Sequence, residues 1–290
     1  DYTYIGVKKC KMCHKGAKKG EVFEKWEKGP HSKAYETLKA KGEEKNPKCL
    51  ECHVTGFNKG GFKVGDATAV KFEGVQCESC HGPLGPLDGI GAHKAEVGLS
   101  TIWEDNGGEI EFESTCNPCH HRQLEDWQMS GHANAGGGTI EGFRDEHYAH
   151  SSSCLPCHTG EGFIAANDAA HADYDGEYSW VGCQTCHDPH GNGHEGQLRT
   201  VDNVYVEYHN GYDPEESGVD GTFTGYGAGQ TCAQCHRARR DTDNVLDQIA
   251  EGYRHFGPHG SPQMDMYIGW GSYEIDGYDY DRTFIHQTAI

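Results

Sequence analysis

The chain has 290 residues and a formal net charge of −20, and only 35% of its residues are hydrophobic. It contains no apolar run of about 18 residues, which excludes a transmembrane helix, and its acidic charge argues against nucleic acid as a partner. A chain of this length would normally bury a substantial core, so we expect something other than aliphatic side chains to fill part of the interior. The first four residues lack the features of a signal peptide, which predicts a secreted chain already processed.

In chain order, the first expected helix spans residues 21–41 and is interrupted at Gly29-Pro30, since proline suits only a first helical turn. Two shorter helices are expected at 124–130 and 243–253. Segments 59–72, 105–113 and 200–226 are expected to be hairpins or loops, and frequent glycine disfavours long elements elsewhere. The acidic segments 173–177 and 213–220 are either Ca²⁺ loops or solvated surface. The predicted fold class is mostly irregular coil with short α-helices and few strands.

Every cysteine belongs to a Cys-x-x-Cys-His motif, and the chain contains seven such motifs. This motif is typical of c-type haem attachment, in which two thiols bond to the haem and the histidine binds the iron. Zinc is the alternative, although zinc does not require a histidine directly after every second cysteine. The sequence therefore predicts seven haem c groups, which would also supply the missing apolar bulk.

The expected covalent anchors are Cys10, Cys13, Cys49, Cys52, Cys77, Cys80, Cys116, Cys119, Cys154, Cys157, Cys183, Cys186, Cys232 and Cys235, and the expected proximal iron ligands are His14, His53, His81, His120, His158, His187 and His236.

The motif spacing indicates an internal repeat. Successive first cysteines are 39, 28, 39, 38, 29 and 49 residues apart, so the pair 39, 28 recurs as 38, 29, which is typical of a repeated unit. The segment from Trp26 to His31 matches the segment from Trp127 to His132. We predict a three-haem module at 1–105, a second at 106–226, and a final part at 227–290 with the seventh haem, together forming one continuous haem-cored unit.

A low-spin electron-transfer haem needs a second strong axial ligand, and with only four methionines histidine is the simplest choice. The repeat favours three candidates, and position near a motif or the C-terminus favours the others. The candidate distal ligands are His31, His93, His132, His150, His190, His259 and His286. The alternative for each is an ordinary surface histidine in a glycine-rich loop.

Several stretches resemble the multihaem c-type cytochromes: 26–31, 127–132, 74–83 (Gly-Val-x-Cys-Glu-x-Cys-His-Gly-Pro) and 186–191 (Cys-His-Asp-Pro-His-Gly). That group includes tetrahaem nitrification cytochromes and surface cytochromes. The tail from Gly257 through Met266 is similar to a stretch of extracellular multihaem cytochromes, some of which polymerise into nanowires. The resemblance implies electron transfer outside the cytoplasm, at the cell surface or beyond it, with the periplasm as the alternative. The implied partners are redox partner cytochromes or extracellular acceptors.

Charge is distributed unevenly along the chain. Residues 1–50 carry a net charge of +6 and residues 51–290 a net charge of −26. A basic head can dock on the acidic part of another copy, and a head-to-tail contact that does not close makes a filament. Equally, the lysines can simply solvate two helices or neutralise haem propionates within the same subunit.

The predicted function is long-range electron transfer through seven haems, without catalysis and without membrane insertion. The alternatives are a soluble periplasmic carrier and a multihaem reductase with one open haem site.

Overall fold

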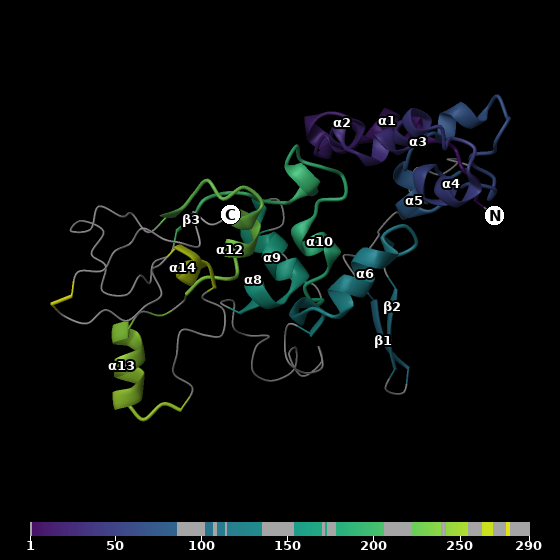
Figure 1. Cartoon of the computed structure of the whole chain (residues 1–290). Helices are drawn as coiled ribbons and strands as arrows, with labels where there is room; N and C mark the ends of the chain where they lie inside the picture. Colours follow the sequence, from purple (N-terminus) through teal and green to yellow (C-terminus); the bar gives the residue numbers. More distant parts are fainter. Residues whose placement is uncertain are drawn as a thin grey trace. The chain divides into compact units, whose positions relative to one another are not determined.

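The computed structural model describes residues 2–85, 102–106, 109–113, 115–134, 154–169, 172, 178–205, 222–238, 240, 242–254, 263–268 and 277–278 (Figure 1). By its internal contacts the chain separates into two units, Asp1–Arg199 and Thr200–Ile290. The first unit contains six of the Cys-x-x-Cys-His motifs and the second contains the seventh. The division into three modules stays a prediction.

Short helices joined by irregular chain make up both units (Figure 1). Among the described residues, the α-helices of the first unit are α1 (Val7–His14), α2 (Val22–Lys28), α3 (Ala34–Lys41), α4 (Pro47–His53), α5 (Cys77–His81), α6 (His121–Gln128), α8 (Leu155–His158), α9 (Gly160–Asn167) and α10 (Cys183–Cys186). Those of the second unit are α12 (Gly229–Ala233), α13 (Thr242–Ala250) and α14 (Gln263–Ile268). Short 3₁₀ helices span Ala17–Lys19, His31–Lys33, Ala69–Phe72, Gly131–Asn134 and Glu195–Gln197. Among the described residues, no helix is long and apolar enough to cross a membrane.

Strands are few. In the first unit β1 (Ile102–Asn106) pairs antiparallel with β2 (Glu109–Glu113), and in the second β3 (Val204–Tyr205) pairs antiparallel with β4 (Thr222–Phe223). The predicted fold class, mostly coil with short helices and few strands, is confirmed.

The expected elements match the observed ones closely. The helix expected at 21–41 is present as α2 and α3, interrupted at Gly29-Pro30. The helix expected at 124–130 begins earlier, as α6, because the carbonyl of His120 accepts a hydrogen bond from the backbone N–H of Leu124 and the helix starts directly after the fourth motif. The third expected helix is α13, which ends three residues before the predicted boundary at 253. The acidic segments 173–177 and 213–220 lie outside the described residues.

Two tryptophans occupy equivalent places in the sequence repeat and make the same hydrogen bond. The indole N–H of Trp26 donates to the carbonyl of Val75 at 2.8 Å, and that of Trp127 donates to the carbonyl of Val181 at 2.9 Å. Each carbonyl lies two residues before the first cysteine of a motif. Each tryptophan helix is followed by a 3₁₀ helix that contains a histidine, His31 or His132. Local structure therefore repeats along with the sequence.

A glycine allows the third motif to approach His31 closely. Gly74 has φ of +80°, and a Cβ atom there would lie 2.6 Å from the carbonyl oxygen of Ser32. Only glycine tolerates both the positive φ and the close approach of the Ser32 carbonyl. The next residue, Val75, then donates its backbone N–H to the carbonyl of His31 at 2.9 Å.

The apolar cores are small. In the first unit the main buried cluster is Tyr35, Leu38, Leu50, Val54, Phe62, Ala69 and Phe72. In the second unit it is Val204, Phe223 and Ala233. Neither cluster includes the histidine of a Cys-x-x-Cys-His motif.

A buried carboxylate fixes the start of α1 against α5. The side chain of Glu78 accepts hydrogen bonds from the backbone N–H groups of Ile5, Gly6 and Leu84 at 2.8–3.1 Å, and Glu78 is only 1% exposed. Beside it, the side-chain oxygen of Gln76 accepts from the N–H of Val7 at 2.8 Å. Hydrogen bonds to a charged acceptor are the stronger kind, so Glu78 holds the first and third motifs side by side.

The substitution Glu78→Gln tests this role. An amide offers one acceptor oxygen, and its NH₂ group would face N–H donors, so we expect the free energy of unfolding to fall by about 1.5–3 kcal/mol. The measurement is guanidinium unfolding followed by circular dichroism. Glu51→Gln is the control, because Glu51 is an exposed residue inside the second motif. Equal stability of the two variants would contradict the role.

Candidate haem site

The Cys-x-x-Cys-His motifs lie on or beside single helical turns. Helices α1, α4, α5 and α8 each end at the histidine of a motif, and α10 begins at the first cysteine of the sixth motif. Residues three apart lie on the same face of a helix, so the two sulfurs of a motif point the same way and the histidine follows at once. This arrangement suits a flat ring bonded at one edge by two sulfurs and held at its centre by an imidazole.

The cysteines themselves favour a covalently attached group. No disulfide joins any of the 14 cysteines, all of which lie in the described part of the chain, and none of them is buried. Unmodified cysteine is among the most buried residue types. Partly or fully exposed cysteines in every motif therefore fit thiols that bond to a bulky partner.

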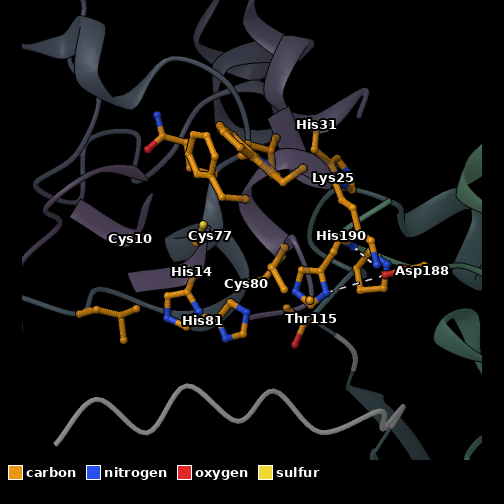
Figure 2. Close-up of a pocket in the computed structure, with 18 of the residues that line it drawn as sticks. Cys10, His14, Lys25, His31, Cys77, Cys80, His81, Thr115, Asp188 and His190 are labelled. Atoms are coloured by element: carbon orange, nitrogen blue, oxygen red, sulfur yellow. Dashed lines mark hydrogen bonds and ion pairs between the residues drawn. The ribbon is translucent and has the colours of Figure 1, made fainter. Parts of the chain in front are cut away.

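A cavity of about 610 Å³ in the first unit brings four motifs together (Figure 2). It is lined by Cys10, Cys13 and His14 of the first motif, by Cys77, Cys80 and His81 of the third, by Cys116 of the fourth and by Gln184 of the sixth. Phe23 and Trp26 contribute apolar wall, and His31 and His190 also line it. Its volume is in the range of sites that hold a cofactor.

Two pairs of imidazoles face one another in and beside this cavity. The ring centroids of His81 and His190 are 6.3 Å apart with planes 9° from parallel, and those of His31 and His120 are 6.2 Å apart with planes at 67°. With metal–nitrogen bonds of about 2.0 Å, two imidazoles on opposite sides of one metal ion have centroids about 6 Å apart. Each pair joins one predicted proximal ligand to one predicted distal ligand, and its spacing fits one iron.

The two predicted distal histidines in these pairs favour the neutral form. Burial lowers the pKa of His31, and the neighbouring His120 lowers it further. Burial likewise lowers the pKa of His190, against an opposing effect of the Asp188 carboxylate. Neutral imidazole is the form that binds a metal, so both side chains are suited to ligation.

Several other motif histidines have one ring nitrogen fixed by a hydrogen bond. Nδ1 lies 2.8 Å from the carbonyl of Ala34 in His53, 2.6 Å from the carbonyl of Gly196 in His187, and 3.0 Å from Oε1 of Gln263 in His236. An N–H donated in this way fixes the ring and leaves Nε2 to the metal. Gln263, which sequence reasoning did not identify, therefore belongs to the site.

His194 has the same arrangement, with Nδ1 2.9 Å from the carbonyl of Leu198. His194 is not among the predicted ligands, because nothing in its immediate sequence distinguishes it from a surface histidine.

Contacts between sulfurs show which motifs are neighbours. Hydrogen bonds link Cys10 to Cys77, Cys52 to Cys119, and Cys116 to Cys183. Burial raises the pKa of Cys80 to about 11, and the nearby Cys116 adds to the shift. The first motif therefore adjoins the third, and the fourth adjoins the second, third and sixth.

The remaining candidate distal ligands are less defined. His132 lies in the 3₁₀ helix Gly131–Asn134, at the position equivalent to His31. His93, His150, His259 and His286 lie outside the described residues. Within the ranges that the structure describes, no three His, Cys, Asp or Glu side chains are grouped so as to hold a metal ion, whereas a structural zinc site takes four protein ligands. The two pairs of imidazoles fit haem iron, for which the protein supplies only axial ligands.

Known proteins resemble this chain. The family model described as cytochrome c554 and c-prime matches residues 9–82 and again residues 115–188. Cytochrome c-554 of Nitrosomonas europaea is 32% identical over 143 residues, which cover 41% of this chain and 58% of that protein. The multihaem cytochrome MtrA of Shewanella baltica is 26% identical over 159 residues, which cover 50% of this chain and 46% of that protein. The chain thus spans about half the length of these relatives, and no solved structure matches it.

The two matched regions have equal length and contain six of the seven motifs. Because together they span half of the chain, it belongs to the cytochrome c554 and c-prime family and is a multihaem c-type cytochrome.

Proposed function

We propose that this chain carries electrons over a long range through seven haem c groups. The observation that carries the proposal is that two motif histidines, His120 and His81, each face a second imidazole, at centroid spacings of 6.2 and 6.3 Å. An iron held between two histidines has no open position for a substrate and changes oxidation state without exchanging ligands. Such an iron suits electron transfer better than catalysis.

The proposed roles follow from this arrangement. The 14 cysteines anchor the haems and the seven motif histidines are proximal ligands. His190 is the second ligand of the iron bound by His81, and His31 is the second ligand of the iron bound by His120. His93, His132, His150, His259 and His286 stay candidates for the other irons.

Contacts between motifs support a branched path. A thioether sulfur is bonded to the edge of its haem, so two sulfurs in contact bring two haem edges close together. The contacts support a route from the first motif through the third and fourth to the sixth, which the second motif joins at the fourth.

A collar of lysines around the first motif supports a role in docking. Its members are exposed and lie within a segment, 2–20, that contains no acidic residue: Lys8, Lys9, Lys11, Lys15, Lys18 and Lys19. In the described part of the chain, Lys11 alone among them makes an ion pair, with Glu27 at 3.9 Å. A clustered positive charge steers an acidic partner, and residues 51–290 of a second copy carry a net charge of −26. We therefore propose head-to-tail association of copies into an extracellular filament.

The haem count and ligation can be tested together. We expect a mass of about 36 kDa, since each haem adds about 0.6 kDa, and seven low-spin ferric irons by electron paramagnetic resonance. His31→Ala should convert one of the seven irons to high spin, because it removes a ligand. His121→Ala, which changes the exposed neighbour of His120, should leave all of them low spin. A high-spin iron in the unaltered protein would contradict complete bis-histidine ligation and favour the reductase alternative.

The lysine collar can be tested by charge reversal. We expect native preparations to show filaments in negative-stain electron microscopy, and Lys8, Lys9, Lys11 and Lys15→Glu to abolish them. The control replaces Lys33, Lys41, Lys45 and Lys48, which are also exposed and give the same charge change. Discrete particles of the native protein at low salt, where charge attraction is strongest, would contradict the filament and favour a soluble carrier. They would leave electron transfer untouched.

A further inference from the structure

One short loop segment contains one of the predicted distal imidazoles that line the cavity, His190, and contacts the other, His31. It is Asp188-Pro189-His190, directly after the sixth motif. The carbonyl of Pro189 accepts a hydrogen bond from the ring of His31. Oδ1 of Asp188 lies 3.8 Å from Nδ1 of His190 and accepts a hydrogen bond from the backbone N–H of His190 at 3.0 Å (Figure 2). The imidazole of His31 thus neighbours a neutral carbonyl, whereas that of His190 neighbours a carboxylate.

The loop holds this carboxylate in place. The backbone N–H of Asp188 donates to the carbonyl of Gln197 at 2.8 Å, and the side-chain amide of Gln197 donates to the carbonyl of Asp188 at 3.0 Å. The loop ends at Arg199, whose backbone N–H donates to the carbonyl of Cys186 at 2.8 Å. The Asp188 side chain is only 17% exposed, so solvent screens its charge poorly.

Charge near an axial ligand shifts the reduction potential of the iron. A negative charge near a ligating imidazole favours the ferric state of the iron, whereas a carbonyl carries no net charge. Lys25 and Arg199 also lie near His190 and oppose this effect in part. Arg199 is shared, however, because it interacts with Asp168 as well as with Asp188.

We propose that Asp188 is a positioning residue that lowers the reduction potential of the iron between His81 and His190 below that of the iron between His31 and His120. An electron then moves downhill from the third haem to the fourth. The ferrous iron of the third haem is oxidised, the ferric iron of the fourth is reduced, and no bond forms or breaks. This inference rests on the proposed ligation of these two irons.

The test is Asp188→Asn in the haem-loaded protein, followed by a redox titration monitored by electron paramagnetic resonance. The nearly parallel planes of His81 and His190 and the steeply inclined planes of His31 and His120 give different low-spin signals, which distinguishes the two irons. We expect the potential of the His81–His190 iron to rise, with about a tenfold change in its ratio of reduced to oxidised forms at a fixed potential, which corresponds to about 59 mV.

Asp168→Asn is the matched control. Asp168 lines the same cavity, and its substitution removes the same charge near Arg199. It should move the His81–His190 potential much less. An unchanged potential in Asp188→Asn, or an equal rise in both variants, would overturn the proposal. His190→Ala separates this outcome from a failure of the ligation itself: if His190 is not a ligand, all low-spin signals persist in that variant.

Discussion

The facing imidazoles draw together segments that lie far apart in the sequence. His31 meets His120, and His81 meets His190, so each pair joins residues of the first predicted module to residues of the second. Most of the other long-range contacts described for the first unit also bring motifs and histidines together. The Trp26 hydrogen bond, the close approach at Gly74 and the carboxylate of Glu78 all position a motif or a histidine, and the apolar clusters are too small to do so alone.

The sequence predicted those features that depend on neighbouring residues. The seven motifs and the interruption at Gly29-Pro30 follow from local patterns. The segment 105–113 was expected to be a hairpin or a loop, and it lies in the β1–β2 hairpin. The repeat was also visible, and the equal hydrogen bonds of Trp26 and Trp127 agree with it. The sequence did not show which histidine faces which, because that depends on the path of the chain between them. Nor did it single out Asp188 or Gln263, whose roles arise only from contacts made in the folded chain.

The composition of the chain and its short helices have one physical explanation, which follows from its membership of a multihaem family. A chain that wraps rigid, apolar, covalently bound rings needs little aliphatic material of its own, and its helices need be only long enough to present two cysteines and a histidine. This accounts for the low hydrophobic content, the abundant glycine and the short elements. The family matches end at residue 188, close to the boundary of the second unit at Thr200, so the seventh motif lies in a part of the chain with its own small core.

In the proposed ligation, each of the two predicted modules supplies a histidine to an iron of the other. This arrangement affects the order in which the haem sites are completed. On the proposed ligation, the second ligand of the third haem is His190, which lies later in the chain than its motif. The second ligand of the fourth haem is His31, which lies earlier than its motif. In N-to-C order, the second ligand proposed for the fourth iron therefore precedes its motif, whereas the one proposed for the third iron comes 109 residues after His81. Until the segment with His190 has folded, an iron bound at the third motif would be open to small ligands and oxidants. Folding of the second predicted module would then also protect the first.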